Sequence, residues 1–385
     1  MVGREVPALL GVTVEGERVT LLRVESHALH YSIEGGHTAA GRAHTAIIGL
    51  HASSADNVRL HWLAAQFTSM TEWLGTEAFD LLGAFARGGE IQYTTPNPQV
   101  VAKSRGKTFS VYGDVGGLEE KTRRATSVSL RQRTWVDVRA RTRRPLAELQ
   151  EDIFRFGAFL SFVCGRDCPA TELVGEVTVP AEMFGEIKRS PYRDRVWVLF
   201  HRAVGDLEPT NPRFMLFRYP YAENVAFRPL ARWFRRAPLL EPVYNLYLSA
   251  IPTQSPKLEY RFLALAQALD AYYFRRFRKE PAFVDVVRAL VNELPRSVRR
   301  GVPDRFAVLV KDTRHYFTHW NPRYEQKAAK GDDLIAVMFG LMVMLELLLL
   351  RELGFSKSEI AQMAERNARV GQRIAQSFGQ LSDAP

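Results

Sequence analysis

Short apolar runs with β-branched and aromatic residues recur through the first half of the chain, bounded by Gly, Asn, Asp and Ser. Such runs are typical of successive antiparallel strands. The predicted strands are 19–24, 29–33, 46–50, 58–63, 109–112, 127–130, 134–139, 173–179 and 196–200. In one of them Val136 and Val138 alternate with Asp137 and Arg139, which predicts one buried face and one face exposed to water.

A helix is expected between these strands, starting at Pro145, because proline suits a first helical turn. Leu146, Leu149 and Ile153 follow at helical spacing. A β-sandwich with an attached helix fits this order of elements. From about Gly205 onward the pattern weakens, and it includes the basic aromatic run 232–236.

The rest of the chain has helical periodicity throughout. Five helices are predicted: 258–272, 281–294, one from Pro303 that stops near Asn321-Pro322, 334–350, and one from the capping box 356–359 towards Phe378. Short loops between them indicate a four- or five-helix bundle. The expected fold is therefore α+β and multidomain: a β-rich, sandwich-like N-terminal domain (1–250) followed by an all-α bundle (251–385).

The segment 334–350 is apolar enough to resemble a membrane span. It is shorter than the ~20 residues that a bilayer requires, and it contains Glu346. We expect it to be the central buried helix of the bundle, apolar on nearly all sides because other helices surround it. The N-terminus has no long apolar segment, so we expect no signal peptide, no membrane association and a cytoplasmic location.

Composition narrows the class of protein. The hydrophobic fraction of 46% indicates a folded chain and argues against wholesale disorder. The only cysteines, Cys164 and Cys168, lack the further ligands of a zinc site and are expected to be buried thiols. The net charge of +10 favours a polyanionic partner such as RNA, although it is also compatible with a merely soluble basic protein.

The end of the third bundle helix, 311–322, concentrates groups that handle protons and phosphates. Arg314 offers a planar, permanently charged fork that matches two phosphate oxygens. His315 and His319 are one helical turn apart, near the helix C-terminus, where the dipole favours the imidazolium form. RNA can be cleaved without a metal when a base, an acid and a fixed cation are supplied. One copy of Arg-x4-His is sparse for all three roles, so a symmetric dimer that pairs two copies is chemically sensible.

Two other interpretations of these residues remain open. Arg314 could pair with Asp312 or another acid while His319 bonds a free carbonyl at a structural helix end. His315 and His319 could instead be two ligands of a metal, but no further ligand motif accompanies them, and we predict neither metal nor cofactor.

In this context, the chain resembles the HEPN superfamily of ribonucleases, and more narrowly its ApeA-like branch. The resemblance rests on the helix 258–270, on Arg314-x4-His319 followed by 320–322, and on the β-rich front half with 67–75 and 145–165. It implies that Arg314 and His319 are the catalytic pair. The family's residue after the arginine is usually small and polar, often asparagine, so His315 departs from the pattern and its role is open. An acidic residue of the opening helix, Asp270 or Glu259, is implied as support.

The resemblance also implies a function: an RNA-cleaving endonuclease of anti-phage, abortive-infection defence, working as a homodimer through the bundle. The N-terminal domain would be a sensor or regulator that receives a phage-derived trigger. The alternative is an inactive HEPN module that binds RNA, a nucleotide or a partner. Basic residues near the motif are candidate RNA contacts: Arg275, Arg276, Arg278, Lys279 and Lys311.

Overall fold

The structure is a computed structural model. It describes residues 5–31, 37–75, 79–80, 92–94, 97–121, 126–179, 183–184, 187–188, 192–200, 208–219, 227–251 and 257–383. The chain forms two compact units. A sheet unit contains Met1–Met70, Glu77–Phe156 and Ala170–Glu208, and a helical unit contains Thr71–Thr76, Gly157–Pro169 and Pro209–Pro385.

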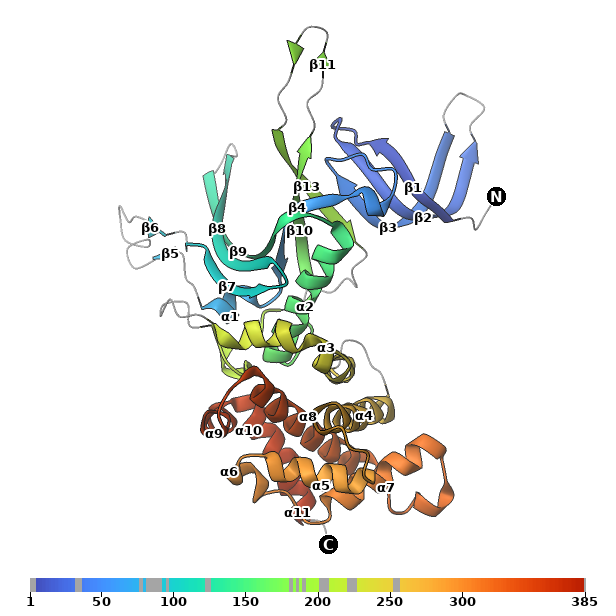
Figure 1. Cartoon of the computed structure of the whole chain (residues 1–385), viewed down its shortest axis with the longest axis vertical. Helices are drawn as coiled ribbons and strands as arrows, with labels where there is room; N and C mark the ends of the chain where they lie inside the picture. Colours follow the sequence, from blue (N-terminus) through green and yellow to red (C-terminus); the bar gives the residue numbers. More distant parts are fainter. Residues whose placement is uncertain are drawn as a thin grey trace. The chain divides into compact units, whose positions relative to one another are not determined.

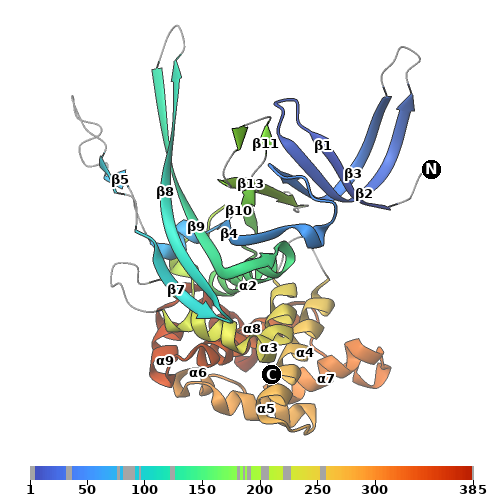
Figure 2. The same cartoon turned by 45° about the horizontal axis from the view of Figure 1, so that its top comes forward.

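Nine strands of the sheet unit form one sheet in which every neighbouring pair is antiparallel. In sheet order they are β1 (Glu5–Val12), β2 (Arg18–Tyr31), β3 (His37–Ile48), β13 (Tyr192–Phe200), β10 (Ala170–Val179), β4 (Arg59–Phe67), β9 (Thr126–Pro145), β8 (Lys107–Lys121) and β7 (Gln99–Ser104). Figure 2 shows β8 and β9 side by side as a long ribbon. Two small hairpins accompany the sheet, β5 (Phe79–Asp80) with β6 (Gln92–Tyr93) and β11 (Met183–Phe184) with β12 (Ile187–Lys188).

The nine predicted runs fall on seven observed strands, and residues 32–33 lie outside the described part of the chain. The runs 19–24 and 29–33 are one long strand, β2, and the runs 127–130 and 134–139 are one long strand, β9, whereas β1 and β7 were not predicted. The predicted sandwich-like form is a single sheet, at least among the described residues. Its core is closed by the helix α2 (Leu146–Cys164), where Phe156 packs on Phe67 of β4 with ring centroids 5.6 Å apart. Lys107 also links β8 to α2 through ion pairs with Glu148 and Asp152.

One detail of β9 differs from the prediction. Val136 and Val138 are buried as expected, but Asp137 on the opposite face is also buried, with 1% of its surface exposed. The reason is a tertiary contact: Trp62 of β4 donates its Nε1–H to Asp137 Oδ2 at 2.8 Å, and the neighbouring side chains cover the carboxylate.

The helical unit follows the predicted pattern from α4 onward (Figure 1). Its helices are α1 (Met70–Leu74), α3 (Arg228–Ser249), α4 (Leu258–Phe277), α5 (Phe283–Glu293), α6 (Arg296–Arg299), α7 (Phe306–His319), α8 (Gly331–Leu353), α9 (Lys357–Arg366), α10 (Ala368–Ile374) and α11 (Gln380–Asp383), with the C-terminal part of α2.

The helix α3 was not predicted from the sequence, and it moves the domain boundary. The prediction placed residues up to 250 in the β-rich domain, whereas α3 packs on α4 and α8 and belongs to the helical unit. Pro238 and Pro242 inside α3 conceal its helical periodicity, since proline normally ends or kinks a helix. The basic aromatic run is part of this helix, and Trp233 stacks on Tyr244 in the core.

The apolar helix α8 is the centre of the bundle, as expected. By length and composition it could cross a membrane, but 83% of its most apolar window is buried among other helices. Glu346, near its middle, is fully buried and accepts hydrogen bonds from Tyr247 at 2.5 Å and Arg373 at 2.6 Å. Arg369 lies 3.3 Å from the same carboxylate oxygen. These three partners explain how an ionised group is accommodated there.

The predicted fifth helix is interrupted. The capping box at Ser356 and Glu359 begins α9 as expected. The helix stops at Asn367, whose side chain caps α10 by accepting from Val370 N and also donates to the carbonyl of Met215. A π-helical turn, Ala375–Gly379, then leads to α11. Asparagine favours such caps over helix interiors, and this effect outweighed the continuous hydrophobic pattern.

Candidate functional site

The candidate site lies where α7 meets α4 and α5. The helix α7 carries Arg314, His315 and His319 in its last turns and ends at Trp320, which adopts the left-handed conformation (φ 49°). Few residues other than glycine take this conformation, and here it turns the chain towards Asn321-Pro322 as the sequence predicted. Trp320 follows His319 directly, and 63% of its surface is exposed.

Arg314 is held by two other helices. Its Nη2 donates to Asp270 Oδ2 of α4 at 3.0 Å, and its guanidinium lies 4.1 Å from the centre of the Phe283 ring at the start of α5. A third of the arginine side chain (33%) and 39% of the aspartate side chain are exposed. An ion pair this open contributes at most about 1 kcal/mol to stability, so it orients the guanidinium more than it stabilises the fold.

The two histidines are arranged on the adjacent side of α7. Their ring centroids are 4.9 Å apart, and the His315 ring also lies 4.2 Å from the Tyr324 ring. Tyr324 belongs to a single helical turn, Pro322–Tyr324, that is capped by Asn321. The loop that follows returns to α7, because Ala329 N donates to the buried Oγ1 of Thr313 at 2.9 Å. His315 is therefore packed between His319 and an anchored tyrosine.

The supporting acids occupy different places. Asp270 contacts Arg314, whereas Glu259 precedes it by eleven residues on the same helix, roughly 16 Å along the axis. Asp312, the other acid considered for Arg314, is buried and pairs with Lys311 at 2.7 Å. Among the predicted acids, only Asp270 is thus positioned to orient the arginine.

The basic residues also divide into two groups. Arg275 donates to the carbonyls of Pro238 and Leu239 in α3, at 3.1 and 3.5 Å. The acceptor at Pro238 is free for it because the residue four positions later, Pro242, has no N–H. Arg276 pairs at 3.0 Å with Glu352, which is buried. These two arginines therefore have structural partners within the bundle.

The other three basic residues lie in the α4–α5 connection and on α7. Arg278 and Lys279 are exposed in the connection between α4, which carries Asp270, and Phe283 of α5. Lys311 lies one turn before His315 and is engaged by Asp312, with its ammonium 6.0 Å from the Tyr324 ring. Positive charge therefore remains available mainly at the α4–α5 connection.

Several residues of the site were not identified from the sequence. Phe283 and Tyr324 touch Arg314 and His315 through tertiary packing that no local spacing reveals. The exposed Trp320 was visible next to the motif but had no predicted role. Across the described ranges, no group of three or more His, Cys, Asp or Glu side chains could hold a metal ion, so His315 and His319 lack further protein ligands there. The buried thiols Cys164 and Cys168 are confirmed.

Comparison with known families agrees with this architecture. Residues 3–229 match the ApeA N-terminal domain 1, and residues 263–359 match the ApeA-like HEPN domain. The matched HEPN region contains Asp270, Phe283, Arg314 and His319, so the whole candidate site lies inside it. No curated protein and no solved structure matched the chain. The two domain matches cover most of the sequence in the family's order, and the chain belongs to the ApeA-like HEPN proteins.

Proposed function

We propose that this protein is a metal-independent endoribonuclease that acts in anti-phage defence by abortive infection. The observation that carries the proposal is the placement of Arg314 and His319 at the end of α7 within an ApeA-like HEPN domain, with Arg314 oriented by Asp270 and Phe283. The net charge of +10 favours an RNA substrate, and we place the reaction in the cytoplasm.

The proposed cleavage needs a general base, a general acid and a fixed cation. One imidazole takes the proton of the 2′-OH while the 2′-oxygen attacks phosphorus. The bond from phosphorus to the 5′-oxygen breaks, and a second, protonated imidazole gives its proton to that leaving oxygen. The products are a 2′,3′-cyclic phosphate and a 5′-OH end. Arg314 stabilises the charge that develops on the phosphoryl oxygens, because its guanidinium keeps exposed N–H donors beyond the one bonded to Asp270.

The two imidazoles are proposed to come from two chains. His319 is exposed at the helix end and can approach a substrate, whereas His315 is only partly exposed and packs on Tyr324. A homodimer through the bundle would place two Arg314 and two His319 side chains around one phosphate. One His319 would then act as base and the other as acid.

A second candidate function is a HEPN module that binds RNA or a partner without cleaving it. The ion pair between Arg314 and Asp270 favours this alternative, because the guanidinium already has a carboxylate partner at 3.0 Å. The two functions make opposite predictions for RNA incubated with the wild-type protein.

The test is cleavage of RNA by the purified protein in the presence of a chelator. We expect shortened RNA whose new ends are 2′,3′-cyclic phosphate and 5′-OH. RNA that binds with a steep salt dependence but stays intact would favour the binding module instead. Cleavage that the chelator abolishes would contradict the metal-independent chemistry.

The defence role has a separate test in cells. Induction of the wild-type protein should arrest bacterial growth, either on its own or when a phage trigger is supplied. The Arg314→Ala variant, expressed to the same level, should permit growth. Equal arrest by wild type and variant would show that toxicity does not come from this site.

A further inference from the structure

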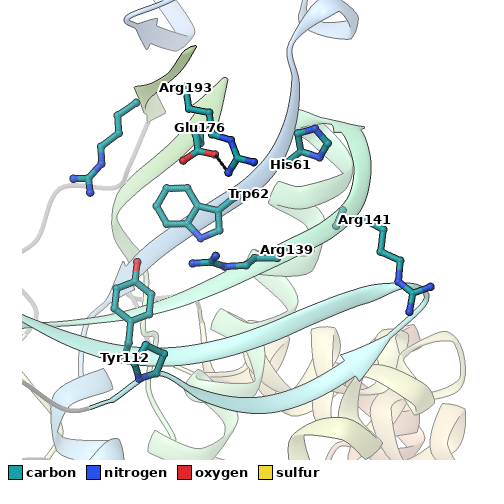
Figure 3. A pocket seen from close by; sticks show the side chains of 10 residues that line it. His61, Trp62, Tyr112, Arg139, Arg141, Glu176 and Arg193 are labelled. Carbon is teal, nitrogen blue, oxygen red and sulfur yellow. Dashed lines mark hydrogen bonds and ion pairs between the residues drawn. The ribbon is translucent and has the colours of Figure 1, made fainter. Parts of the chain in front are cut away.

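A cavity lies on the sheet unit, formed entirely by its strands and the residues beside them. It has a volume of about 580 Å³ and is shown from close by in Figure 3. Trp62 lies at its centre, with Tyr112 and Arg139 below it and Arg193 and Glu176 above it in that view. Pockets of this volume are typical of small-molecule sites.

The pocket residues come together through the register of the sheet. Arg195 of β13 pairs with Glu176 of β10, Glu176 with Trp62 of β4, and Trp62 with Arg139 of β9. Directly paired residues of antiparallel strands point to the same face, so these four side chains form one row across four strands. The members are as much as 133 positions apart in the chain (62 to 195), which is why local patterns did not reveal the site.

The buried carboxylate of Asp137 fixes the centre of the row. Its Oδ2 accepts from Trp62 Nε1 at 2.8 Å and from Arg139 Nε at 2.9 Å. The Arg139 guanidinium is thereby held 5.8 Å from the Trp62 ring, while 64% of its side chain stays exposed. Its terminal N–H groups remain directed to solvent, so an aromatic face and a cation are presented together.

Tyr112 supplies a second aromatic ring and a hydroxyl donor. It packs with Trp62 against the small core of Ala64, Trp135 and Val174. Burial, together with the nearby charge of Asp137, raises the pKa of the Tyr112 phenol well above its usual range. The hydroxyl therefore remains protonated at physiological pH and can donate a hydrogen bond.

A basic extension continues from the pocket towards the β7–β8 turn. A neighbouring cavity of about 450 Å³ shares Arg139, Ala140 and Arg141 with the first one and is also lined by Lys103 and Arg105. Arg141 points away from Trp62 in Figure 3, which agrees with its position between the two cavities. The lining of the second cavity contains basic residues and no acid, and its buried Lys107 is already neutralised by Glu148 and Asp152.

We propose that these two neighbouring cavities bind a free nucleotide, with the base against Trp62 and Tyr112 and the phosphates along Arg139 and Arg141 towards Arg105. Aromatic faces next to arginines recognise a base joined to phosphates. An acidic peptide would use the cations but would leave the two aromatic rings without a function. The proposal is independent of the ribonuclease site, because every contributing residue belongs to the sheet unit.

The test measures binding of ATP, GTP, CTP and UTP to the full chain by calorimetry. We expect at least one triphosphate to bind at concentrations below about 1 mM, and at least tenfold more tightly than its nucleoside or inorganic tripolyphosphate alone. Absence of binding by all four would overturn the proposal. So would equal or tighter binding of polyglutamate.

Variants assign the binding to these cavities. Arg141→Ala and Arg105→Ala each should weaken the triphosphate by roughly tenfold without affecting the nucleoside, because each removes a charged donor from the phosphate side. Trp62→Leu should weaken both ligands. Arg131→Ala is the matched control, since Arg131 is exposed on β9 and does not line either cavity. If Arg131→Ala weakens binding as much as Arg141→Ala, binding is nonspecific and the proposal fails.

Discussion

The guanidinium of Arg314 lies between a carboxylate of α4 and an aromatic ring of α5, and these two contacts fix its orientation. Phe283 covers one face of the guanidinium, and Asp270 holds one of its nitrogens. The remaining N–H donors of the guanidinium are therefore held in a fixed orientation, as bidentate recognition of two phosphate oxygens requires.

Asp270→Asn tests this positioning role. The amide oxygen can still accept from Arg314, but without the charge, so we expect slower RNA cleavage, by roughly tenfold, through a lower kcat with little change in KM. The thermal melt should stay near that of wild type because the pair is partly exposed. Glu259→Gln, on the same helix but far from Arg314, is the control and should cleave normally. A fall in both variants would indicate a general effect of acidic residues on α4.

His315→Ala tests the residue that departs from the family pattern. Since His315 packs between His319 and Tyr324, we expect the variant to loosen His319 and reduce cleavage several-fold, with the shape of the pH–rate profile retained. A profile that loses one of its limbs would make His315 a proton-transfer group rather than a packing partner.

At the scale of single residues, the sequence was informative only where chemistry and local spacing coincide. Helical periodicity placed His315 and His319 on one face, and proline chemistry located the end of α7. The partnership of Arg314 with Phe283 could not be predicted, because it depends on how α5 packs on α7. The same limit applies to Trp62 and Asp137, which are 75 positions apart and meet only through strand register.

At the scale of elements, most strands and amphipathic helices were predictable, and the exceptions among the helices have local causes. Two prolines concealed α3, and one asparagine divided the last predicted helix into α9 and α10. In both places a tertiary hydrogen bond stabilises the unexpected local structure. Arg275 occupies a carbonyl that the proline leaves free, and the carbonyl of Met215 accepts from Asn367.

Asn367→Ala tests the division between α9 and α10. The variant loses the cap of α10 and leaves the Met215 carbonyl without this donor, so the free energy of unfolding should fall by about 1–3 kcal/mol. Chemical denaturation provides the measurement. Asn292→Ala, at an exposed position of α5, should change stability by less than about 0.5 kcal/mol. Equal stability of Asn367→Ala and wild type would mean that the cap does not support the helical unit.

At the scale of the whole molecule, the most apolar helix of the helical unit contains a buried charge cluster around Glu346. Burial alone would raise the pKa of Glu346, but Arg369, Arg373 and the Tyr247 hydroxyl outweigh this effect and hold the pKa below its usual range. A carboxyl group with a lowered folded-state pKa stabilises the fold above its unfolded-state value. That contribution is lost as the pH falls through the folded-state value.

We therefore expect the helical unit to lose stability as the pH falls below the ordinary glutamate value of 4.5. Glu346→Gln should remove this part of the acid sensitivity. It should also cost about 3–5 kcal/mol at neutral pH, because two arginines keep buried charges without their counterion. The measurement is denaturant unfolding followed at several pH values, with Glu325→Gln in an exposed ion pair as control. A variant as stable as wild type at neutral pH would show that the cluster contributes no net stability.

The central claim concerns the pair Arg314 and His319 on α7. The most direct measurement is the single-turnover rate of RNA cleavage in the presence of a chelator for wild type, Arg314→Ala, His319→Ala and Arg288→Ala. Arg288 is an exposed arginine of α5 paired with Asp285, and it serves as the control for loss of positive charge. We predict that Arg314→Ala and His319→Ala each lower the rate by roughly a hundredfold or more. The thermal melts of both variants should stay close to that of wild type. Arg288→Ala should cleave at the wild-type rate. Cleavage by Arg314→Ala and His319→Ala at the wild-type rate would contradict the assignment of this pair as the catalytic residues.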